Sequence, residues 1–131
     1  MWPFAKPKPT PPGVTIYNRL GEEIDRVEGV WDLTDADLRH RSWAHADLSG
    51  LCLNDANLEG ANLMGARLVR TSFCGAKLRN AELSFSDATA ANFRSARLEG
   101  CLMYRSETYL ARFDDAMLSE SSDIPGVRIV A

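Results

Sequence analysis

The sequence predicts an all-β solenoid in which a five-residue repeat, Ala-(Asp/Asn)-Leu-x-x, forms each side of a continuous coil. The repeat runs from Ala36 to Leu118 without an insertion or a deletion. Its first and third positions form two apolar columns: in seventeen copies, the first is Ala eleven times and the third is Leu ten times and Phe three times. These two columns are the candidate core.

A period of five excludes the simple alternatives. In an α-helix, a step of five residues turns the next Leu by roughly 140°, so no helix face results. In a flat strand, an odd step would place successive Leu residues on opposite faces. The chain must therefore bend once per repeat, and the glycines at the fifth position, such as Gly50, Gly60 and Gly65, favour a turn there.

The number of sides in one coil is indicated by the aromatic residues. Phe73, Phe93 and Phe113 are spaced by twenty residues, in register with Leu33 and Leu53. We therefore expect the rings to stack once every four repeats. The outward charges Arg39, Glu59, Arg79 and Glu99 alternate in sign with the same spacing.

The repeat closely resembles that of the pentapeptide-repeat family, over about two thirds of the chain. The resemblance implies a right-handed, quadrilateral β-helix with one coil per twenty residues, hence a little over four coils. This handedness agrees with the general preference of parallel β crossovers.

Four segments are expected. Residues 1–13 form a Pro-rich flexible tail, with five of the six prolines, and a proline-recognising partner is a less favoured alternative. Residues 14–31 form an N-terminal cap. Residues 32–120 form the β-helix, and residues 121–131 form a C-terminal capping segment, in which Pro125-Gly126 would break the coil and let the tail fold back.

The cap is predicted to be a β-hairpin that covers the first coil. Val14 to Tyr17 alternate as in a strand, Asn18 to Gly21 can turn, and Glu22 to Val27 can return. A short helix is the alternative, because Ile24, Val27 and Trp31 also match one helical face.

The first coil departs from the repeat at two positions. Arg41 stands at an Ala position and Trp43 at a Leu position. Because a buried unpaired charge is costly, Arg41 should point out of the end of the coil or pair with a carboxylate, and Asp35 and Asp37 are the expected partners.

Two sets of apolar residues follow from the register. The predicted core comprises Leu48, Leu53, Leu58, Leu63, Leu68, Phe73, Leu78, Leu83, Phe93, Leu98 and Phe113. A predicted outward interaction patch comprises Phe85, Leu102, Tyr104, Tyr109 and Leu110, extended by Met64 and Val69. A contiguous apolar patch of this kind is typical of an interface, although the C-terminal segment of the chain is an alternative cover for it.

Composition limits the class of protein. A chain of 131 residues suits one domain, and a net charge of −3 argues against direct nucleic-acid or anionic-membrane binding. Three cysteines without C-x-x-C spacing, and no hydrophobic run resembling a signal peptide or membrane span, favour a cytoplasmic protein without a metal site.

No catalytic, cofactor-binding or metal-ligating residues are predicted. His40 and His45 are the only histidines, and we interpret them as solvated corner residues, since no neighbouring Cys, Asp or Glu completes a ligand or nucleophile arrangement. The chain is therefore expected not to be an enzyme.

The function we expect is that of a scaffold that binds an unknown protein partner or a second copy of itself. The family resemblance implies one alternative: some members imitate duplex DNA and bind or protect DNA gyrase and related topoisomerases. A DNA mimic needs a persistently negative surface, whereas this chain alternates signs along its columns.

Overall fold

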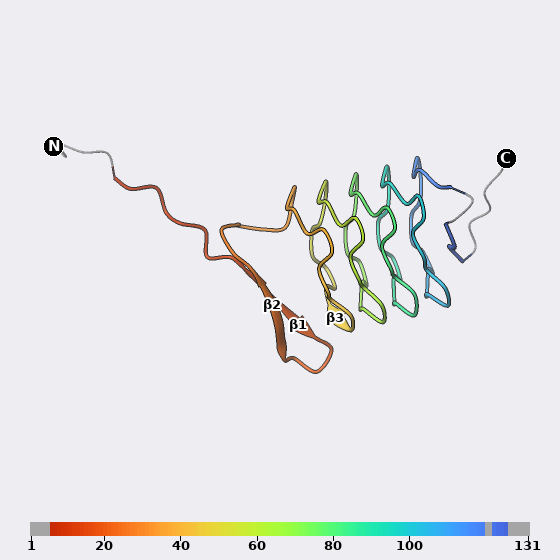
Figure 1. Ribbon diagram of the computed structural model, residues 1–131, viewed down its shortest axis with the longest axis horizontal. Coiled ribbons are helices and arrows are strands. Elements are labelled where there is room, and N and C mark those ends of the chain that lie inside the picture. Colours follow the sequence, from red (N-terminus) through yellow and green to blue (C-terminus); the bar gives the residue numbers. More distant parts are fainter. Residues whose placement is uncertain (1–5, 120–121, 126–131) are drawn as a thin grey trace.

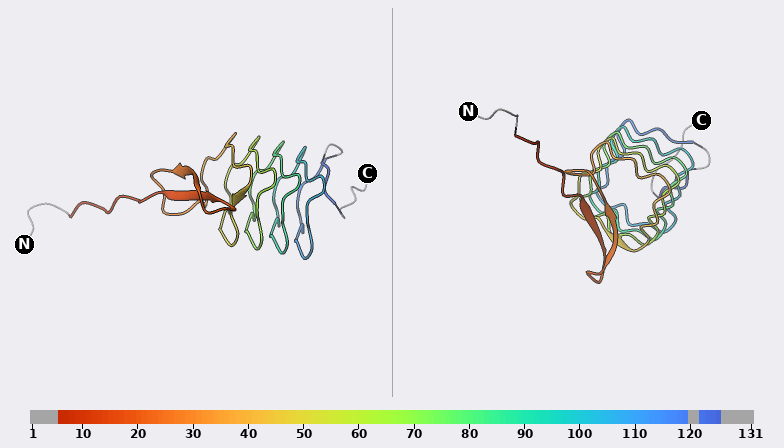
Figure 2. Two further views of the ribbon diagram at one scale, coloured as in Figure 1. Left: turned by 90° about the horizontal axis from the view of Figure 1, so that it is seen from below. Right: turned by 60° about the vertical axis from the view of Figure 1, so that its left-hand side comes forward.

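The computed structural model describes residues 6–119 and 122–125. Its named strands are β1 (Val14–Asn18), β2 (Glu23–Val27) and β3 (Ala46–Asp47), and the described residues contain no helix. Figure 1 shows a hairpin at the N-terminal end of a row of stacked coils. Seen nearly end-on in Figure 2, the coils superimpose on one squared outline. The coils form a right-handed β-helix, as the family resemblance implies.

One coil takes twenty residues. The second positions of the repeat form parallel bridges at this spacing, from Asp37 with Asn57 to Arg97 with Met117. Each third-position N–H donates to a carbonyl in the next coil, as Leu63 does to Glu82 at 2.7 Å. The prediction of four repeats per coil is therefore confirmed.

Two kinds of hydrogen bond shape the bend of each repeat. Every fifth-position residue from Asp35 to Asp115 has a positive φ, and the N–H that follows it closes a four-residue turn. The fourth-position N–H, which this turn leaves free, is often accepted by the second-position side chain. Asn62 Oδ1, for example, accepts the N–H of Met64 at 3.0 Å. This bond explains why the repeat favours Asp or Asn at its second position.

At two of the corner glycines, a histidine ring adds a steric reason. The His40 ring lies over Gly60, where an added Cβ would meet Nδ1 at 2.5 Å, and His45 lies over Gly65 in the same way. Since both glycines also have a positive φ, no other residue fits these corners without strain.

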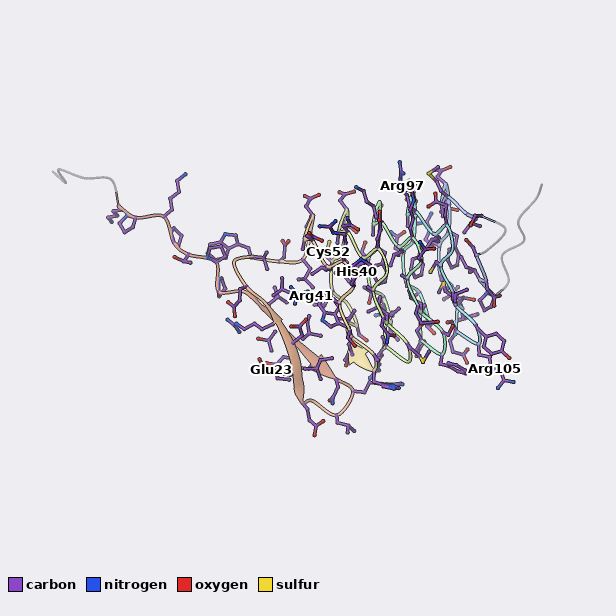
Figure 3. All side chains as sticks on the ribbon, viewed as in Figure 1. Glu23, His40, Arg41, Cys52, Arg97 and Arg105 are labelled. Atoms are coloured by element: carbon purple, nitrogen blue, oxygen red, sulfur yellow. The ribbon has the colours of Figure 1, made fainter. Side chains whose placement is uncertain are left out.

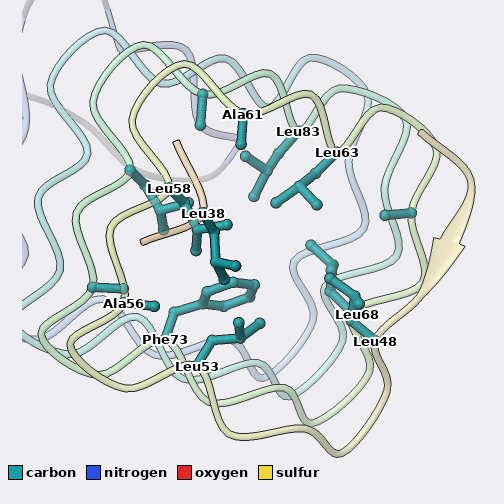
Figure 4. Close-up of a cluster of buried hydrophobic side chains, with 14 of the residues drawn as sticks. Leu38, Leu48, Leu53, Ala56, Leu58, Ala61, Leu63, Leu68, Phe73 and Leu83 are labelled. Atoms are coloured by element: carbon teal, nitrogen blue, oxygen red, sulfur yellow. The ribbon is translucent and has the colours of Figure 1, made fainter. Parts of the chain in front are cut away.

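The first and third positions point inward and form one continuous core (Figure 4). The Phe73 and Phe93 rings stack with centroids 5.0 Å apart, and Phe93 and Phe113 with centroids 5.1 Å apart. Phe113, expected in the core, is only partly buried because it is the last ring of the stack. The other predicted core residues are fully buried: Leu48, Leu53, Leu58, Leu63, Leu68, Phe73, Leu78, Leu83, Phe93 and Leu98.

The hairpin prediction is confirmed, and the helix alternative is wrong. β1 pairs antiparallel with β2, and β1 pairs in turn with β3, so the hairpin extends one side of the first coil. The hairpin buries Ile16 and Val27 in the core, while Trp31 is exposed. The Asn18 side chain organises the turn by accepting the N–H groups of Leu20 and Glu22, each at 2.9 Å.

The irregular first coil is tied to the hairpin by one carboxylate. Asp25 of β2 accepts hydrogen bonds from Arg41 Nη1 at 3.0 Å and from Trp43 Nε1 at 2.6 Å. The expected partners of Arg41 are therefore wrong: Asp37 pairs with Arg39 in its own repeat at 2.8 Å, and the true partner comes from the cap.

The chain outside the coils is described in part. Residues 6–10 are exposed and extend from the body in Figure 1, and Gly13 N–H donates to the carbonyl of Val30 at 3.1 Å. Residues 1–5 of the predicted tail lie outside the described residues.

At the C-terminal end, the chain does not leave the coil where expected. Asp123 bridges Leu102, and Ile124 is buried, so this part of the predicted capping segment continues the β-helix. The spacing is now 21 residues, which indicates one extra residue before Ser122. Residues 120–121 and 126–131 lie outside the described part of the chain.

Candidate interaction surface

Four residues of the predicted patch lie on two neighbouring corners near the C-terminal end of the β-helix, and Leu102 lies on the side that leads to the first of these corners. Each residue reaches the surface because it occupies a second, fourth or fifth position, which faces outward. The exposed fractions are 52% for Phe85, 40% for Leu102, 52% for Tyr104, 72% for Tyr109 and 66% for Leu110. We call these five residues the apolar patch.

The first corner is an aromatic ridge. Phe85 and Tyr104 meet edge to face, with centroids 5.9 Å apart and an interplanar angle of 89°. The Arg105 guanidinium lies 5.5 Å from the Tyr104 ring centroid, and its side chain extends from the last coils in Figure 3. Met64, 37% exposed, occupies the same column as Tyr104 two coils earlier. These contacts hold the ring of Tyr104 in place at the surface.

The second corner carries Tyr109 and Leu110, with half-buried Val69 in the column of Tyr109. Between the corners run the second-position residues Asp87 and Glu107, which are bridge partners of like charge. The apolar ridges therefore flank a short acidic strip.

Elsewhere the outward charges follow the predicted alternation only in part. Arg79 and Glu99 pair across coils at 2.9 Å, as their spacing predicts. Arg39 instead pairs with Asp37 in its own repeat, and its hydrogen bonds lower the pKa of Asp37 to about 2. Lys77 and Arg97, a stacked pair of cations, break the alternation on another side.

The residues considered for chemistry are dispersed. His40 and His45 are exposed on successive corners. Cys52 is exposed, Cys74 is half-buried, and burial, followed by the charge of Glu82, raises the pKa of the Cys101 thiol to about 12. Within residues 6–119 and 122–125, no three His, Cys, Asp or Glu residues are grouped as metal ligands.

Sequence reasoning missed one surface feature. An open hollow lies where the hairpin meets the first coils, lined in part by Tyr17, Asn18, Arg19 and Asp47. It exists because β1 pairs with β3, and nothing in the repeat indicates which side of the coil the hairpin joins.

Across the described ranges, no helix has the length and apolar character needed to cross a bilayer.

Comparison with known proteins agrees with this geometry. The family model for pentapeptide repeats matches residues 32–68 and 66–103, in eight copies. A search of curated proteins finds no match.

Two solved structures are similar. HetL, described as a pentapeptide repeat protein involved in heterocyst differentiation regulation in the cyanobacterium Nostoc sp. PCC 7120, is 33% identical, with a TM-score of 0.66 over 72% of this chain and 43% of HetL. A pentapeptide repeat protein from the Arabidopsis thaliana thylakoid lumen is 22% identical, with a TM-score of 0.52 over 75% of this chain and 71% of that one. The chain thus spans less than half of HetL. With the repeat, the twenty-residue coil and the family model in agreement, the chain belongs to the pentapeptide repeat family.

Proposed function

We propose that this protein is a non-enzymatic scaffold that binds a protein partner, or a second copy of itself, through the apolar patch. One observation carries the proposal: five large apolar side chains, all at least 40% exposed, gather on two adjacent corners of a coil and on the side next to them. Clustered Tyr, Phe and Leu side chains are typical of the centre of a protein interface.

The surroundings of the patch favour a particular partner chemistry. Asp87 and Glu107 lie between the ridges, and Asp87 also has Arg67 as a bridge partner in the coil before, so a basic side chain placed beside Glu107 would balance the charge of this end of the column. We therefore expect the partner to present apolar side chains together with a Lys or Arg.

The description of HetL as a regulatory protein supports a binding role of this kind. We extend only this general idea to the present chain, because the two proteins share less than half of the HetL length. The free thiol of exposed Cys52 is compatible with the cytoplasmic location that we propose.

The DNA-mimic alternative receives less support. Such a surface must be continuously negative, whereas Arg79 pairs with Glu99, and Lys77 stacks on Arg97. We expect no protection of DNA gyrase in a supercoiling assay, and protection would favour the alternative.

The test compares three full-length baits: wild type, Tyr104→Glu/Tyr109→Glu, and the control Thr34→Glu/Ser49→Glu. The control adds the same charges at fourth positions on coils outside the patch. Light scattering over a range of concentrations measures self-association, and quantitative affinity capture from lysate measures other partners. The proposal predicts binding that the patch variant loses and the control keeps. A monomeric wild type that captures no patch-dependent protein would refute it.

A further inference from the structure

We propose that the side of the coil that carries Lys77 and Arg97 docks onto the acidic strip of a second copy of this chain, so that copies associate side by side. The acidic strip consists of Asp87 and Glu107, and it lies between the two corners of the apolar patch. Because it names an occupant for that patch, this contact rests on the function proposed above.

Two stacked cations form the docking side, which we call the cationic strip. Lys77 and Arg97 are exposed bridge partners, and their other neighbours in the column, Asn57 and Met117, are uncharged. The ion pairs between described residues include neither cation. Since like charges stacked at this spacing repel each other, an acidic surface laid on the cationic strip would be favourable.

The cationic and acidic strips lie on opposite sides of the same coils. Asp87 follows Lys77 by ten residues, which is half of the twenty-residue coil, and the same interval separates the other two members of the strips. Figure 3 accordingly shows Arg97 on the opposite side of the row of coils from Arg105, which lies beside the apolar patch. A copy displaced sideways without rotation therefore presents its cationic strip to the acidic strip of its neighbour. In this arrangement Arg97 faces Glu107, and Lys77 faces Asp87.

The pair of Arg97 with Glu107 should be the stronger of the two. Glu107 is exposed, and its neighbour in the coil before is another acid, Asp87. Asp87 itself is half-buried and has Arg67 as a bridge partner on its other side, so it gains less from Lys77. Reversing the charge of the stronger pair is therefore the sharper test of the contact.

The corners beside the cationic strip carry arginines that suit the apolar patch. Arg94 lies at the corner before the strip and Arg79 at the corner after it, and each is held by an ion pair with the next coil. In the translated arrangement, the corner of Arg94 meets that of Tyr109, and the corner of Arg79 meets that of Tyr104. Because guanidinium groups stack on aromatic rings, these arginines can cover the patch as Arg105 covers one ring within the chain.

The contact joins two different surfaces, so it does not close into a symmetric dimer. Each added copy leaves an acidic strip free at one end of the row and a cationic strip at the other, and the row can grow. The facing sides are one repeat wide and their charges are largely exposed. The association is therefore weak and depends on salt.

Sedimentation equilibrium of the full chain tests the contact. At low salt, the average mass of the wild type should rise with protein concentration, and about 1 M NaCl, where the screening length is about 3 Å, should suppress the rise. Arg97→Glu and Glu107→Lys should each lower the association constant at least about tenfold, because each places like charges opposite one another. The double variant Arg97→Glu/Glu107→Lys should restore association, and so should a mixture of the two single variants. Lys8→Glu, which makes the same charge change as Arg97→Glu in the exposed tail, is the control and should associate as the wild type does.

The outcomes separate this contact from the function proposed above. A wild type that stays monomeric at low salt overturns the contact, while a different protein captured through the patch keeps the function. Self-association that persists in Arg97→Glu, or that the double variant fails to restore, also overturns the contact. Association that follows these charges but is unchanged by Tyr104→Glu/Tyr109→Glu supports the contact and counts against a role for the apolar patch.

Discussion

The indole N–H of Trp43 donates a 2.6 Å hydrogen bond to Oδ2 of Asp25, across 18 residues of sequence. Arg41 reaches the same carboxylate at 3.0 Å. The two residues that depart from the repeat in the first coil are thus the two that recognise the hairpin. Because Trp43 stands at a Leu position and Arg41 at an Ala position, both side chains can hydrogen-bond to Asp25 of the cap.

Asp25→Asn should destabilise the protein by about 1 to 3 kcal/mol at neutral pH, because it weakens charge-assisted hydrogen bonds that are only partly exposed. Urea unfolding measures the loss. Glu23→Gln, which removes a carboxylate from the same exposed strand, is the control and should be nearly neutral.

The Asp25 carboxylate should also make the free energy of unfolding depend on pH. Burial alone would raise the pKa of Asp25, but hydrogen bonds from Trp43 and Arg26 and the charge of Arg41 hold it below 3.8. Because the pKa of Asp25 is lower in the folded protein, its contribution to stability is fully present above the pKa of the unfolded state. That contribution is lost as the pH falls through the pKa of the folded state. The stability gap between wild type and Asp25→Asn should therefore close in acid. A gap of constant size down to roughly pH 2 would contradict the assignment.

Leu63→Ala or Leu78→Ala should cost about 2 to 5 kcal/mol, because each side chain is fully buried in the continuous core. Leu20→Ala is the matched control, since Leu20 is 84% exposed in the hairpin turn and should change stability little. Urea melts of the three variants test the difference. Equal midpoints would contradict the inward orientation of the third position.

Gly60→Ala and Gly50→Ala separate two costs of a corner. Both residues have a positive φ, so each substitution should lose about 1 to 2 kcal/mol through the backbone. Only at Gly60 does the new Cβ also meet the His40 ring, whereas at Gly50 it meets nothing within 4 Å. Gly60→Ala should therefore be the more harmful. In the Gly60→Ala variant, His40→Ala should remove the extra loss of stability caused by the clash, but not the backbone cost that both glycine substitutions share. A double-mutant cycle of unfolding free energies measures the two contributions.

The parts of the fold that the sequence predicts are those that the repeat encodes locally. The spacing of Phe73, Phe93 and Phe113 predicts the twenty-residue coil, and the third-position leucines predict the core. The carboxylate that meets Arg41 was not predictable in the same way. It depends on a long-range pairing of strands whose register the repeat does not specify.

The candidate interaction surface was also predictable from the sequence only in part. Once the twenty-residue period of the coil is known, the positions of Tyr104 and Phe85 in their repeats place both residues on one corner. It does not reveal the contact of Arg105 with the Tyr104 ring, which depends on side-chain conformation. The one-residue shift before Ser122 was also missed, because that segment keeps too little of the repeat to display its register.

Substitutions in the apolar patch should leave folding intact. Tyr104→Glu/Tyr109→Glu should shift the free energy of unfolding by less than about 1 kcal/mol, because both side chains are more than half exposed. Thermal melts beside Thr34→Glu/Ser49→Glu check this. A large loss would indicate that the patch packs against another part of the chain.

Binding of protein by the apolar patch is measured by the ratio of protein bound by the patch variant to that bound by the charge-matched control. Tagged baits are incubated with lysate and with untagged full-length chain, and bound protein is quantified by mass spectrometry. We expect a partner, or the untagged chain itself, that the control retains and the patch variant loses at least about tenfold, because central aromatic residues of the interface are replaced. Equal recovery on both baits would contradict it.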